Sequence, residues 1–433
     1  MRITIHRGSK EVGGSCIELQ SEDSRLVLDV GMPLFGNDRE AIDTFELRRM
    51  SRDELDDHGI LPKVEGLFQD GERPDAILLS HAHLDHTGLL NHTAPEVPVF
   101  ASRGTSKIML AGRLFAAQLA LPRERFREIR PEVPVAIGAF TVTGFPVDHS
   151  TFGCLAYLIE SEGCRVLYTG DIRLHGRKPG MAKRLIECVG NLDIDVMLME
   201  GTHFGFPDGN TANEYELEQD IRAAVDNANG LVLASFSPQH FDRLVAFIRT
   251  AKATGRTFVA DVYTAFIMHL LSNQVSLPMP DPKGFVRVFV PEVLRNKSHG
   301  GTKKIIEKFR DAEIDLQEVQ SNPSQFLMVF RTSMLSDFGD ELPDATTCLY
   351  SRWSGYLESP EWAKAKQKLN DCGGNLKEVH TSGHILSSDI EPFVKAIRPK
   401  TVIPIHTFEP ATFREHFENA LLLEDGEPFE VPC

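Results

Sequence analysis

The apolar and polar positions in the first half of the chain follow the period of β-strands. Segments 1–8, 16–20 and 25–31 alternate or run apolar, and glycines separate them. Further segments with a strand pattern cover 76–79, 97–102, 140–145, 155–160, 165–169 and 196–200. Residues 103–120 instead carry apolar side chains at helical spacing. The first part of the chain therefore predicts a β-rich domain with few helices.

The pattern changes at GFPDGN, residues 205–210, which we interpret as a crossing between domains. Beyond it, apolar positions at helical spacing alternate with short apolar runs such as 231–236 and 257–261. This alternation predicts a small parallel α/β unit, which ends near Cys372-Gly373. A last stretch follows, with strands at 376–380 and 401–405 and helices at 389–397 and 410–421. The predicted division is 1–204, 205–372 and 373–433.

Length and composition narrow the class of protein. A chain of 433 residues suits two domains, or one large domain with an insertion. No apolar run is long enough to span a bilayer and the start lacks a signal-peptide core, so we expect a cytoplasmic protein with no membrane partner. The seven cysteines are scattered without a CxxC pair, which argues against a disulfide framework and against a cysteine zinc finger. The net charge of -16 is unfavourable for nucleic-acid binding unless one face is locally basic.

The stretch SHAHLDHTG, residues 80–88, carries the strongest chemical signal. It follows the apolar run 76–79 directly. His81 and His83 lie two apart, on one face of an extended chain, and Asp85 and His86 follow in the turn. One ion cannot easily take all four side chains from so short a loop, but two adjacent ions can divide them. Imidazole and carboxylate ligands suit zinc at a hydrolytic site, where two ions clamp the attacking and the leaving oxygen.

This loop resembles the signature of the metallo-β-lactamase superfamily, whose members are dinuclear metallohydrolases with an αββα sandwich fold. The family needs further ligands, and PVDHS, LYTGDIR and IPIHT offer them in order, each at a predicted strand end. The resemblance implies that one metal ion is bound by His81, His83 and His149. It implies that the second is bound by Asp85, His86 and His406, with Asp171 bridging both. Asp29 in LDVG matches a position that supports the loop, although a simple turn aspartate explains it nearly as well.

The middle segment indicates a subfamily. A large α/β insertion before the last ligands is similar to that of the β-CASP nucleases. MEGTHFG, with Glu200, and VHTSGH, with His380, Ser382 and His384, are similar to motifs of that subfamily, and VHTSGH followed by PIH is most similar to ribonuclease J and its relatives. The expected fold is thus α/β, an αββα sandwich with an inserted parallel α/β domain. The chain is short for ribonuclease J, so we expect it to lack that family's additional C-terminal domain.

The resemblance also implies roles for individual residues. A leaving phosphodiester oxygen must be protonated, and His384, oriented by Glu200, would be the general acid, with Asp85 part of the catalytic metal site. Glu200 could instead cap a turn, with His384 a support behind the ligands. His380 and Ser382 would contact a substrate phosphate. Further phosphate contacts at strand ends of the insertion would be Ser237, His240, Arg331 and Ser333, although helix capping explains these positions equally well.

These features predict a ribonuclease that uses two Zn²⁺ ions, or Mn²⁺, and attacks a backbone phosphorus with a bridging hydroxide. The resemblance implies products that carry a 5′-phosphate and a 3′-hydroxyl. Exonuclease and endonuclease action both remain open, and single-stranded DNA is an alternative substrate because no feature detects a 2′-hydroxyl. Two further hypotheses are a hydrolase of small esters, thioesters or lactams and a non-catalytic scaffold subunit. A homodimer is compatible with the resemblance.

Overall fold

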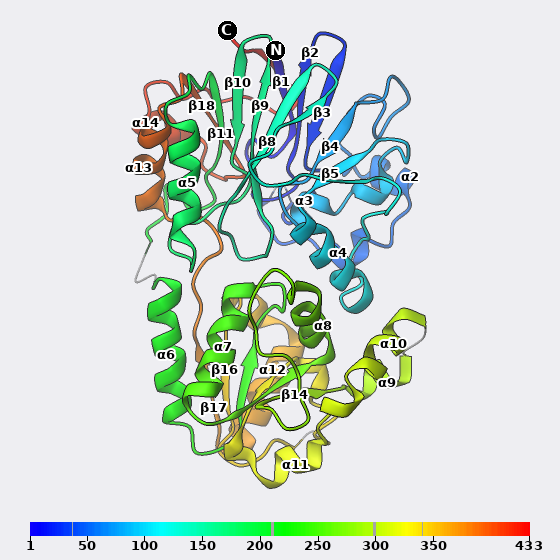
Figure 1. Cartoon of the computed structure of the whole chain (residues 1–433), viewed down its shortest axis with the longest axis vertical. Coiled ribbons are helices and arrows are strands. Elements are labelled where there is room, and N and C mark those ends of the chain that lie inside the picture. Colours follow the sequence, from blue (N-terminus) through cyan, green and yellow to red (C-terminus); the bar gives the residue numbers. More distant parts are fainter. Residues whose placement is uncertain (37, 209–211, 298–299, 340) are drawn as a thin grey trace. The chain divides into compact units, whose positions relative to one another are not determined.

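The chain divides into two compact units. The computed structural model describes all residues except 37, 209–211, 298–299 and 340 (Figure 1). The first unit comprises 1–210 and 383–433, and the second comprises 211–382. The second unit is therefore an insertion in the first. The crossing predicted at 205–210 includes residues 209 and 210, which lie outside the described part of the chain.

The first unit contains two sheets. The seven-stranded sheet has the order β19-β1-β2-β3-β4-β5-β6. Its strands are β1 (Arg2–Arg7), β2 (Cys16–Ser21), β3 (Ser24–Leu28), β4 (Ala76–Leu78), β5 (Val99–Ala101), β6 (Phe126–Glu128) and β19 (Pro428–Glu430). The six-stranded sheet has the order β18-β11-β10-β9-β8-β7. Its strands are β7 (Val135–Ile137), β8 (Phe140–Pro146), β9 (Leu155–Ser161), β10 (Cys164–Tyr168), β11 (Val196–Glu200) and β18 (Thr401–Ile405).

Alternating apolar residues join the two sheets face to face. On β9, Leu155, Tyr157 and Ile159 point into the same core as Ile3 and Ile5 of β1. The intervening residues of β9 face a second core on the other side of the six-stranded sheet. Helices α5 (Pro179–Val189), α13 (Ser387–Ile397) and α14 (Ala411–His416) cover that side, and Figure 1 shows α5 beside α13. In the seven-stranded sheet, the segments between the strands contain the helices α1 (Thr44–Leu47), α2 (Arg52–Asp57), α3 (Leu84–Thr87) and α4 (Arg103–Phe115).

The second unit is built on a single parallel sheet with the order β14-β13-β15-β12-β16-β17. Its strands are β12 (Val232–Ser235), β13 (Thr257–Asp261), β14 (Val286–Phe289), β15 (Phe326–Val329), β16 (Thr347–Tyr350) and β17 (Asn375–Glu378). Its helices are α6 (Glu214–Asp226), α7 (Phe241–Ala253), α8 (Val262–Leu271), α9 (Glu292–Lys297), α10 (Gly300–Lys308), α11 (Leu316–Ser321) and α12 (Pro360–Asp371). The alternation of strand and helix confirms the predicted parallel α/β insertion.

The second unit extends further along the chain than the sequence pattern indicated. Residues 373–382 were assigned to the last segment of the β-rich domain, but β17 pairs in parallel with β16 of the second unit. The glycines interpreted as a domain boundary form a turn between α12 and β17. Gly373 has a φ of 65°, as glycine commonly does just after a helix end, so the chain turns back along the same sheet.

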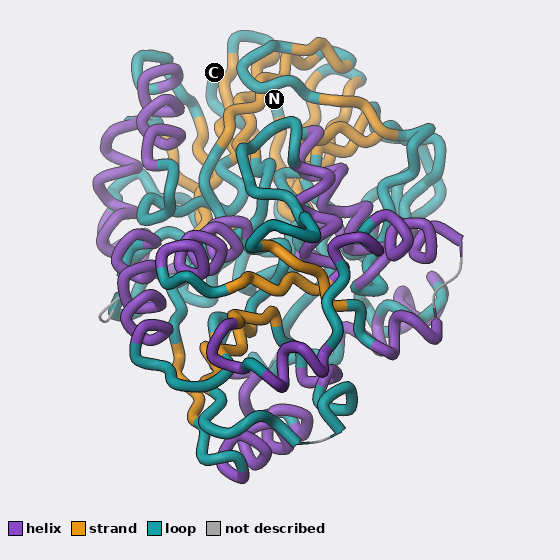
Figure 2. Tube along the Cα trace, turned by 60° about the horizontal axis from the view of Figure 1, so that its bottom comes forward, coloured by secondary structure: helices purple, strands orange, loops and turns teal. Residues whose placement is uncertain are grey.

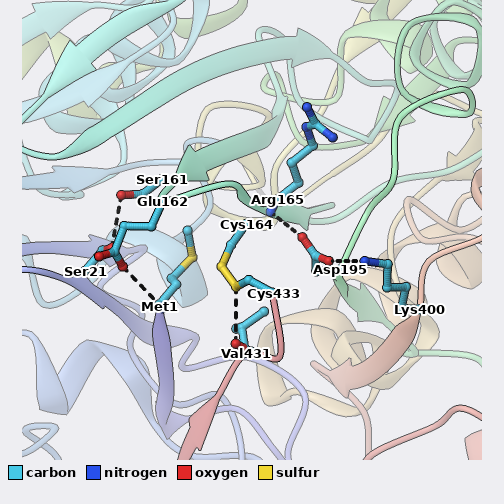
Figure 3. The surroundings of a disulfide bond; sticks show 10 residues. All are labelled: Met1, Ser21, Ser161, Glu162, Cys164, Arg165, Asp195, Lys400, Val431 and Cys433. Atoms are coloured by element: carbon cyan, nitrogen blue, oxygen red, sulfur yellow. Dashed lines mark hydrogen bonds and ion pairs between the residues drawn. A yellow bond between two sulfur atoms is a disulfide. The ribbon is translucent and has the colours of Figure 1, made fainter.

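Both termini lie at the same end of the first unit (Figures 1 and 2) because β19 pairs antiparallel with β1. A disulfide joins Cys433 to Cys164, whose Cα atoms are 5.2 Å apart (Figure 3). The sequence argued against a disulfide framework, and it did not predict this single bond. The two cysteines lie 269 residues apart in the sequence, a separation at which spacing gives no signal. In the described part of the chain, no helix is both long and apolar enough to cross a bilayer.

Candidate metal centre

The loop 80–88 begins at the end of β4, a strand without exposed residues, and closes in the short helix α3. Residues 30–32 hold it in place through backbone hydrogen bonds, from Val30 N to the carbonyl of His86 and from Met32 N to that of Leu84. Gly31 lies between them. A Cβ atom at Gly31 would stand 1.8 Å from the carbonyl oxygen of Asp85, so only glycine allows this approach.

Asp29 orients one histidine of the loop from behind. Its fully buried carboxylate accepts hydrogen bonds from Ser80 N at 2.7 Å and from the Tyr168 hydroxyl at 2.5 Å. The Asp29 Oδ2 atom also lies 2.8 Å from Nδ1 of His86. This contact leaves Nε2 of His86 to face the cluster, as expected for a carboxylate that supports a metal ligand. The predicted supporting position of Asp29 agrees with these contacts.

Three histidines form the first part of the cluster. His83 Nδ1 lies 3.1 Å from Nε2 of His81 and 3.1 Å from Nε2 of His149. Burial lowers the pKa of His81 and His149 well below the usual range and that of His83 to about 4. Neutral imidazoles with their nitrogens turned toward one point are a donor set that suits zinc. The sequence prediction grouped these same three residues.

The second part combines acidic and imidazole groups. His406 Nε2 lies 3.2 Å from Asp85 Oδ2, and His86 Nε2 lies 3.2 Å from Asp171 Oδ2. Asp171 Oδ2 is also 3.7 Å from Nε2 of both His81 and His149. Although burial opposes it, the neighbouring histidines lower the pKa of Asp85 to about 2 and that of Asp171 well below its usual range. Asp171 therefore stands as a carboxylate between the two parts.

The polar atoms at the centre of this cluster approach one another without forming hydrogen bonds. Both carboxylate oxygens of Asp171 and Nε2 of His86 are buried and accept or donate no hydrogen bond within the described part of the chain. A buried carboxylate without hydrogen-bond partners is costly unless a cation neutralises it. His81, His83 and His149 on one side, and Asp85, His86, Asp171 and His406 on the other, each lie close enough to share an ion. The residues present thus fit two bound metal ions.

Glu200 and His384 lie next to the cluster. Glu200, the last residue of β11, is fully buried and accepts a hydrogen bond from Ile172 N at 2.9 Å. Nδ1 of His384 lies 3.2 Å from Glu200 Oε2 and 3.7 Å from Asp171 Oδ2. Burial opposes the imidazolium form, but Glu200 and Asp171 outweigh it and raise the pKa of His384 to about 9. A histidine held protonated beside the cluster is suited to donate a proton.

Thr202 is a member of this site that sequence reasoning missed. Its hydroxyl donates to Glu200 Oε2 at 2.7 Å, and Oγ1 lies 3.1 Å from Nδ1 of His384 and 2.9 Å from Nδ1 of His406. One hydroxyl thus connects the proposed acid, its carboxylate and a candidate ligand. The motif EGT contained the signal, since a threonine two residues after a strand-end glutamate can bond back to it.

A buried ion pair, which sequence reasoning also missed, connects two loops of the cluster. Arg173 is fully buried, and its Nε donates to Asp148 Oδ1 at 3.0 Å. Asp148 precedes His149 directly, and Arg173 lies two residues after Asp171. The pair therefore ties the loop that carries one candidate ligand to the loop that carries another.

The other predicted contacts lie in the second unit, where His240 and Arg331 pair with acidic residues of the same unit. His240 is buried with Nε2 3.4 Å from Glu214 Oε1, and Arg331 forms a 2.7 Å ion pair with Asp261. The carbonyl of Ser237 accepts a hydrogen bond from His240 N, and Ser333 is exposed on a 3₁₀ turn. His380 and Ser382 follow β17, and His380 is exposed. A substrate role for these six residues stays a prediction.

Comparison with known proteins supports the interpretation of the cluster. Residues 58–232, which include the loop 80–88, His149, Asp171 and Glu200, match the family described as "Beta-lactamase superfamily domain". This segment of the chain is therefore similar to the metallo-β-lactamase superfamily. The expected sandwich fold with an inserted α/β domain is thereby confirmed. The matched family and the ribonuclease J relatives both indicate a hydrolytic enzyme.

The similarity to curated relatives extends beyond the segment that matches the family. Ribonuclease J of Mycolicibacterium smegmatis is 24% identical over 98% of this chain and 71% of its own length. Ribonuclease J of Helicobacter pylori is 20% identical over 100% of this chain and 60% of its own. An RNase J-like protein of Methanocaldococcus jannaschii is 23% identical over 60% of this chain and 58% of its own. A protein of unknown function from Enterococcus faecalis shares the fold, with a TM-score of 0.79, 21% identity and 99% of each chain covered.

Proposed function

We propose that this enzyme is a metal-dependent ribonuclease that hydrolyses RNA phosphodiester bonds and leaves a 5′-phosphate and a 3′-hydroxyl. The observation that carries the proposal is the buried cluster of histidines and aspartates with the Glu200–His384 pair beside it. The names of the curated relatives, ribonuclease J and RNase J-like protein, indicate the substrate class. The proposed partner is therefore RNA.

The proposal assigns one metal site to His81, His83 and His149 and the other to Asp85, His86 and His406, with Asp171 in both. The ions proposed are two Zn²⁺, with Mn²⁺ as the alternative. Bound at these residues, they would supply Lewis-acid activation of a water molecule and of the scissile phosphate. Asp29 and the backbone of residues 30–32 keep the ligand loop in position before any ion binds.

His384 is the proposed general acid. It would donate its proton to the oxygen that leaves the phosphorus, and Glu200 would keep it charged until then. Thr202 would fix the positions of the Glu200 and His384 side chains relative to each other through its hydroxyl. His380 and Ser382, from the same loop as His384, are the proposed phosphate contacts, followed by Ser237, His240, Arg331 and Ser333.

One incubation series tests the proposal. Purified protein is incubated with end-labelled and circular RNA and DNA, with zinc, with manganese and with a chelator. We expect RNA cleavage that needs metal, and cleavage of circular RNA would establish endonuclease action. His83→Ala and Asp171→Asn should each lower the rate by about a thousandfold or more, because several kcal/mol of transition-state stabilisation is lost.

His58→Ala is the matched control, since His58 is exposed at the end of α2. Metal content is measured in parallel and should fall in the two ligand variants only. Failure of the wild-type protein to cleave any nucleic acid would refute the proposed function. Full metal-dependent activity in either ligand variant would refute the assignment of the metal site.

A further inference from the structure

Two aromatic side chains of the second unit are exposed side by side. Trp353 is 51% exposed and Tyr356 is 52% exposed. They lie in the segment between β16 and α12, where Ser354–Glu358 form a 3₁₀ turn. Their ring centroids are 5.3 Å apart and the rings are perpendicular. Exposed aromatic rings in contact with each other commonly mark a binding surface.

The structure holds this pair in place. The Trp353 ring lies over Gly355, where an added Cβ would stand 2.4 Å from the ring. The carbonyl of Trp353 accepts a hydrogen bond from the Tyr350 hydroxyl at 2.8 Å, and Leu357 anchors the turn in the core. The two rings are therefore preorganised, which lowers the entropy cost of binding a ligand.

A positive charge accompanies the rings. The Arg352 guanidinium lies 5.2 Å from the centroid of the Tyr356 ring. Burial, together with the charge of Arg331, lowers the pKa of Arg352. In the described part of the chain Arg352 forms no ion pair, whereas Arg331 is paired with Asp261. A partly buried guanidinium that forms no ion pair in the described part of the chain is suited to bind an anionic group.

The position of Arg352 at the carboxyl end of a parallel strand also favours a ligand-binding site there. The parallel strands β12 and β16 are neighbours, and the chain continues from β12 toward the β14 edge of the sheet but from β16 toward the β17 edge. Ligands of such open α/β sheets bind outside the carboxyl ends of the strands at this switch point. Arg331 follows β15 and Arg352 follows β16, so both arginines come from carboxyl ends beside β12.

We propose that Arg352, Trp353 and Tyr356 form a stacking platform for single-stranded RNA. Unpaired bases would stack on the two rings, and Arg352 would bind a phosphate of the same strand. The inference rests on the proposed function for the identity of the strand. A platform of this kind would let a chain with a net charge of -16 bind nucleic acid through stacking and one local cation.

The surroundings favour RNA over a second protein. Ser354, Gly355 and Glu358 around the two rings are exposed and are not large apolar residues, so the rings are not the centre of a wide apolar patch. Protein interfaces instead surround their aromatic anchors with a packed apolar core. A duplex would hide the faces of its bases, so the platform is expected to select single strands.

Tryptophan fluorescence tests the platform directly. The chain has two tryptophans, and Trp362 is buried, so Trp362→Phe leaves the exposed Trp353 as the only indole. This variant, combined with Asp171→Asn and kept free of metal to prevent cleavage, is titrated with an oligoadenylate of about 12 nucleotides. We expect saturable quenching of the emission. An abasic strand of the same length and an RNA duplex should leave the emission unchanged.

Tyr356→Ala should weaken oligoadenylate binding by roughly 5- to 150-fold, the range found when one stacking aromatic is removed. Tyr215→Ala is the matched control, because Tyr215 is 50% exposed in the same unit. Equal affinity of the Tyr356 and Tyr215 variants would overturn the proposal. Unchanged emission at saturating oligoadenylate would also overturn it, as would a dimer in sedimentation that Trp353→Ala dissociates.

The test of the platform can fail or succeed independently of the test of the proposed ribonuclease function. Binding and quenching are measured without metal and without turnover, so they report on the platform alone. RNA cleavage by the wild-type protein without quenching would leave the ribonuclease proposal standing and remove the platform. Quenching without cleavage would support the platform and refute the ribonuclease proposal.

Discussion

The backbone beside the metal loop leaves no room for a methyl group at residue 31. A Cβ on Gly31 would stand 1.8 Å from the carbonyl oxygen of Asp85 and 2.7 Å from Ser15 N, and both are backbone atoms that cannot turn away. We expect Gly31→Ala to destabilise the protein by at least about 3 kcal/mol, as overpacking against backbone does, and to lower metal affinity. Thermal unfolding followed by circular dichroism measures the loss.

Gly180→Ala provides the comparison for that measurement. Gly180 lies in the first turn of α5, and an added Cβ would meet nothing within 4 Å. Alanine should therefore be neutral or slightly stabilising there. A Gly31 variant as stable as the Gly180 variant would mean that the loop 80–88 does not depend on this close approach.

The hydroxyl of Thr202 can be removed with almost no change of shape. Thr202→Val keeps the volume but removes the group that joins Glu200, His384 and His406. We expect kcat on RNA to fall about 10-fold, the worth of one hydrogen bond to a charged group, while metal content stays that of the wild type. Thr93→Val, which alters a buried hydroxyl outside the cluster, should leave kcat unchanged. An unchanged kcat in Thr202→Val would show that His384 needs no such positioning.

Sequence reasoning at this scale found residues whose type alone implies metal chemistry. His149, Asp171 and His406 are recognisable because each follows a predicted strand and matches a family motif. Thr202, Asp148 and Arg173 are not, because threonines and ion-pairing residues occur throughout the chain. Their roles depend on distances between segments, such as the 3.0 Å contact between Arg173 and Asp148, that a sequence does not contain.

Strands and helices were predictable where their apolar pattern was strong. The buried strands β9, β11 and β18 were expected within a residue or two of their bounds. Strand β17 was also expected, but in the wrong unit. Its residues are largely exposed, and nothing in such a pattern shows that its partner is β16. Partner choice in a sheet is a tertiary property, so periodicity locates a strand without assigning it to a sheet.

A disulfide bond ties the end of the C-terminal strand to the other sheet of the first unit. Strand β19 has only three residues and sits at the edge of one sheet, while the disulfide from Cys433 reaches Cys164 at the start of β10 in the other sheet (Figure 3). In oxidised protein we expect Cys433→Ser to lower the free energy of unfolding by about 2–4 kcal/mol, because a long loop is no longer closed. Thermal unfolding with and without a thiol reductant measures this.

The reductant should lower the unfolding temperature of the wild type and leave that of Cys433→Ser unchanged. Cys188→Ser, which removes a thiol that forms no disulfide, should respond to the reductant as the wild type does. A wild-type protein that is indifferent to the reductant would show that the bond contributes nothing to stability.

At the scale of the whole molecule, both units have an apolar core, but only the first unit carries the candidate metal ligands. Each unit has a core of its own, with Tyr157 and Phe393 among the buried residues of the first and Phe330 among those of the second. All seven candidate ligands lie in the first unit. Both tryptophans, Trp353 and Trp362, lie in the second. Metal binding and tryptophan emission thus report on different parts of the chain.

This separation leads to an expectation about unfolding. An ion that binds only the folded first unit stabilises it by about 4 kcal/mol when present at a thousand times its dissociation constant. The unfolding of that unit, followed by circular dichroism at increasing zinc, should therefore move to higher temperature. The unfolding of the second unit, followed by tryptophan emission, should not move, and Asp171→Asn should abolish the shift of the first. If emission shifts as far as circular dichroism does, the two units unfold as one, and the insertion depends for its stability on the metal-bearing sandwich.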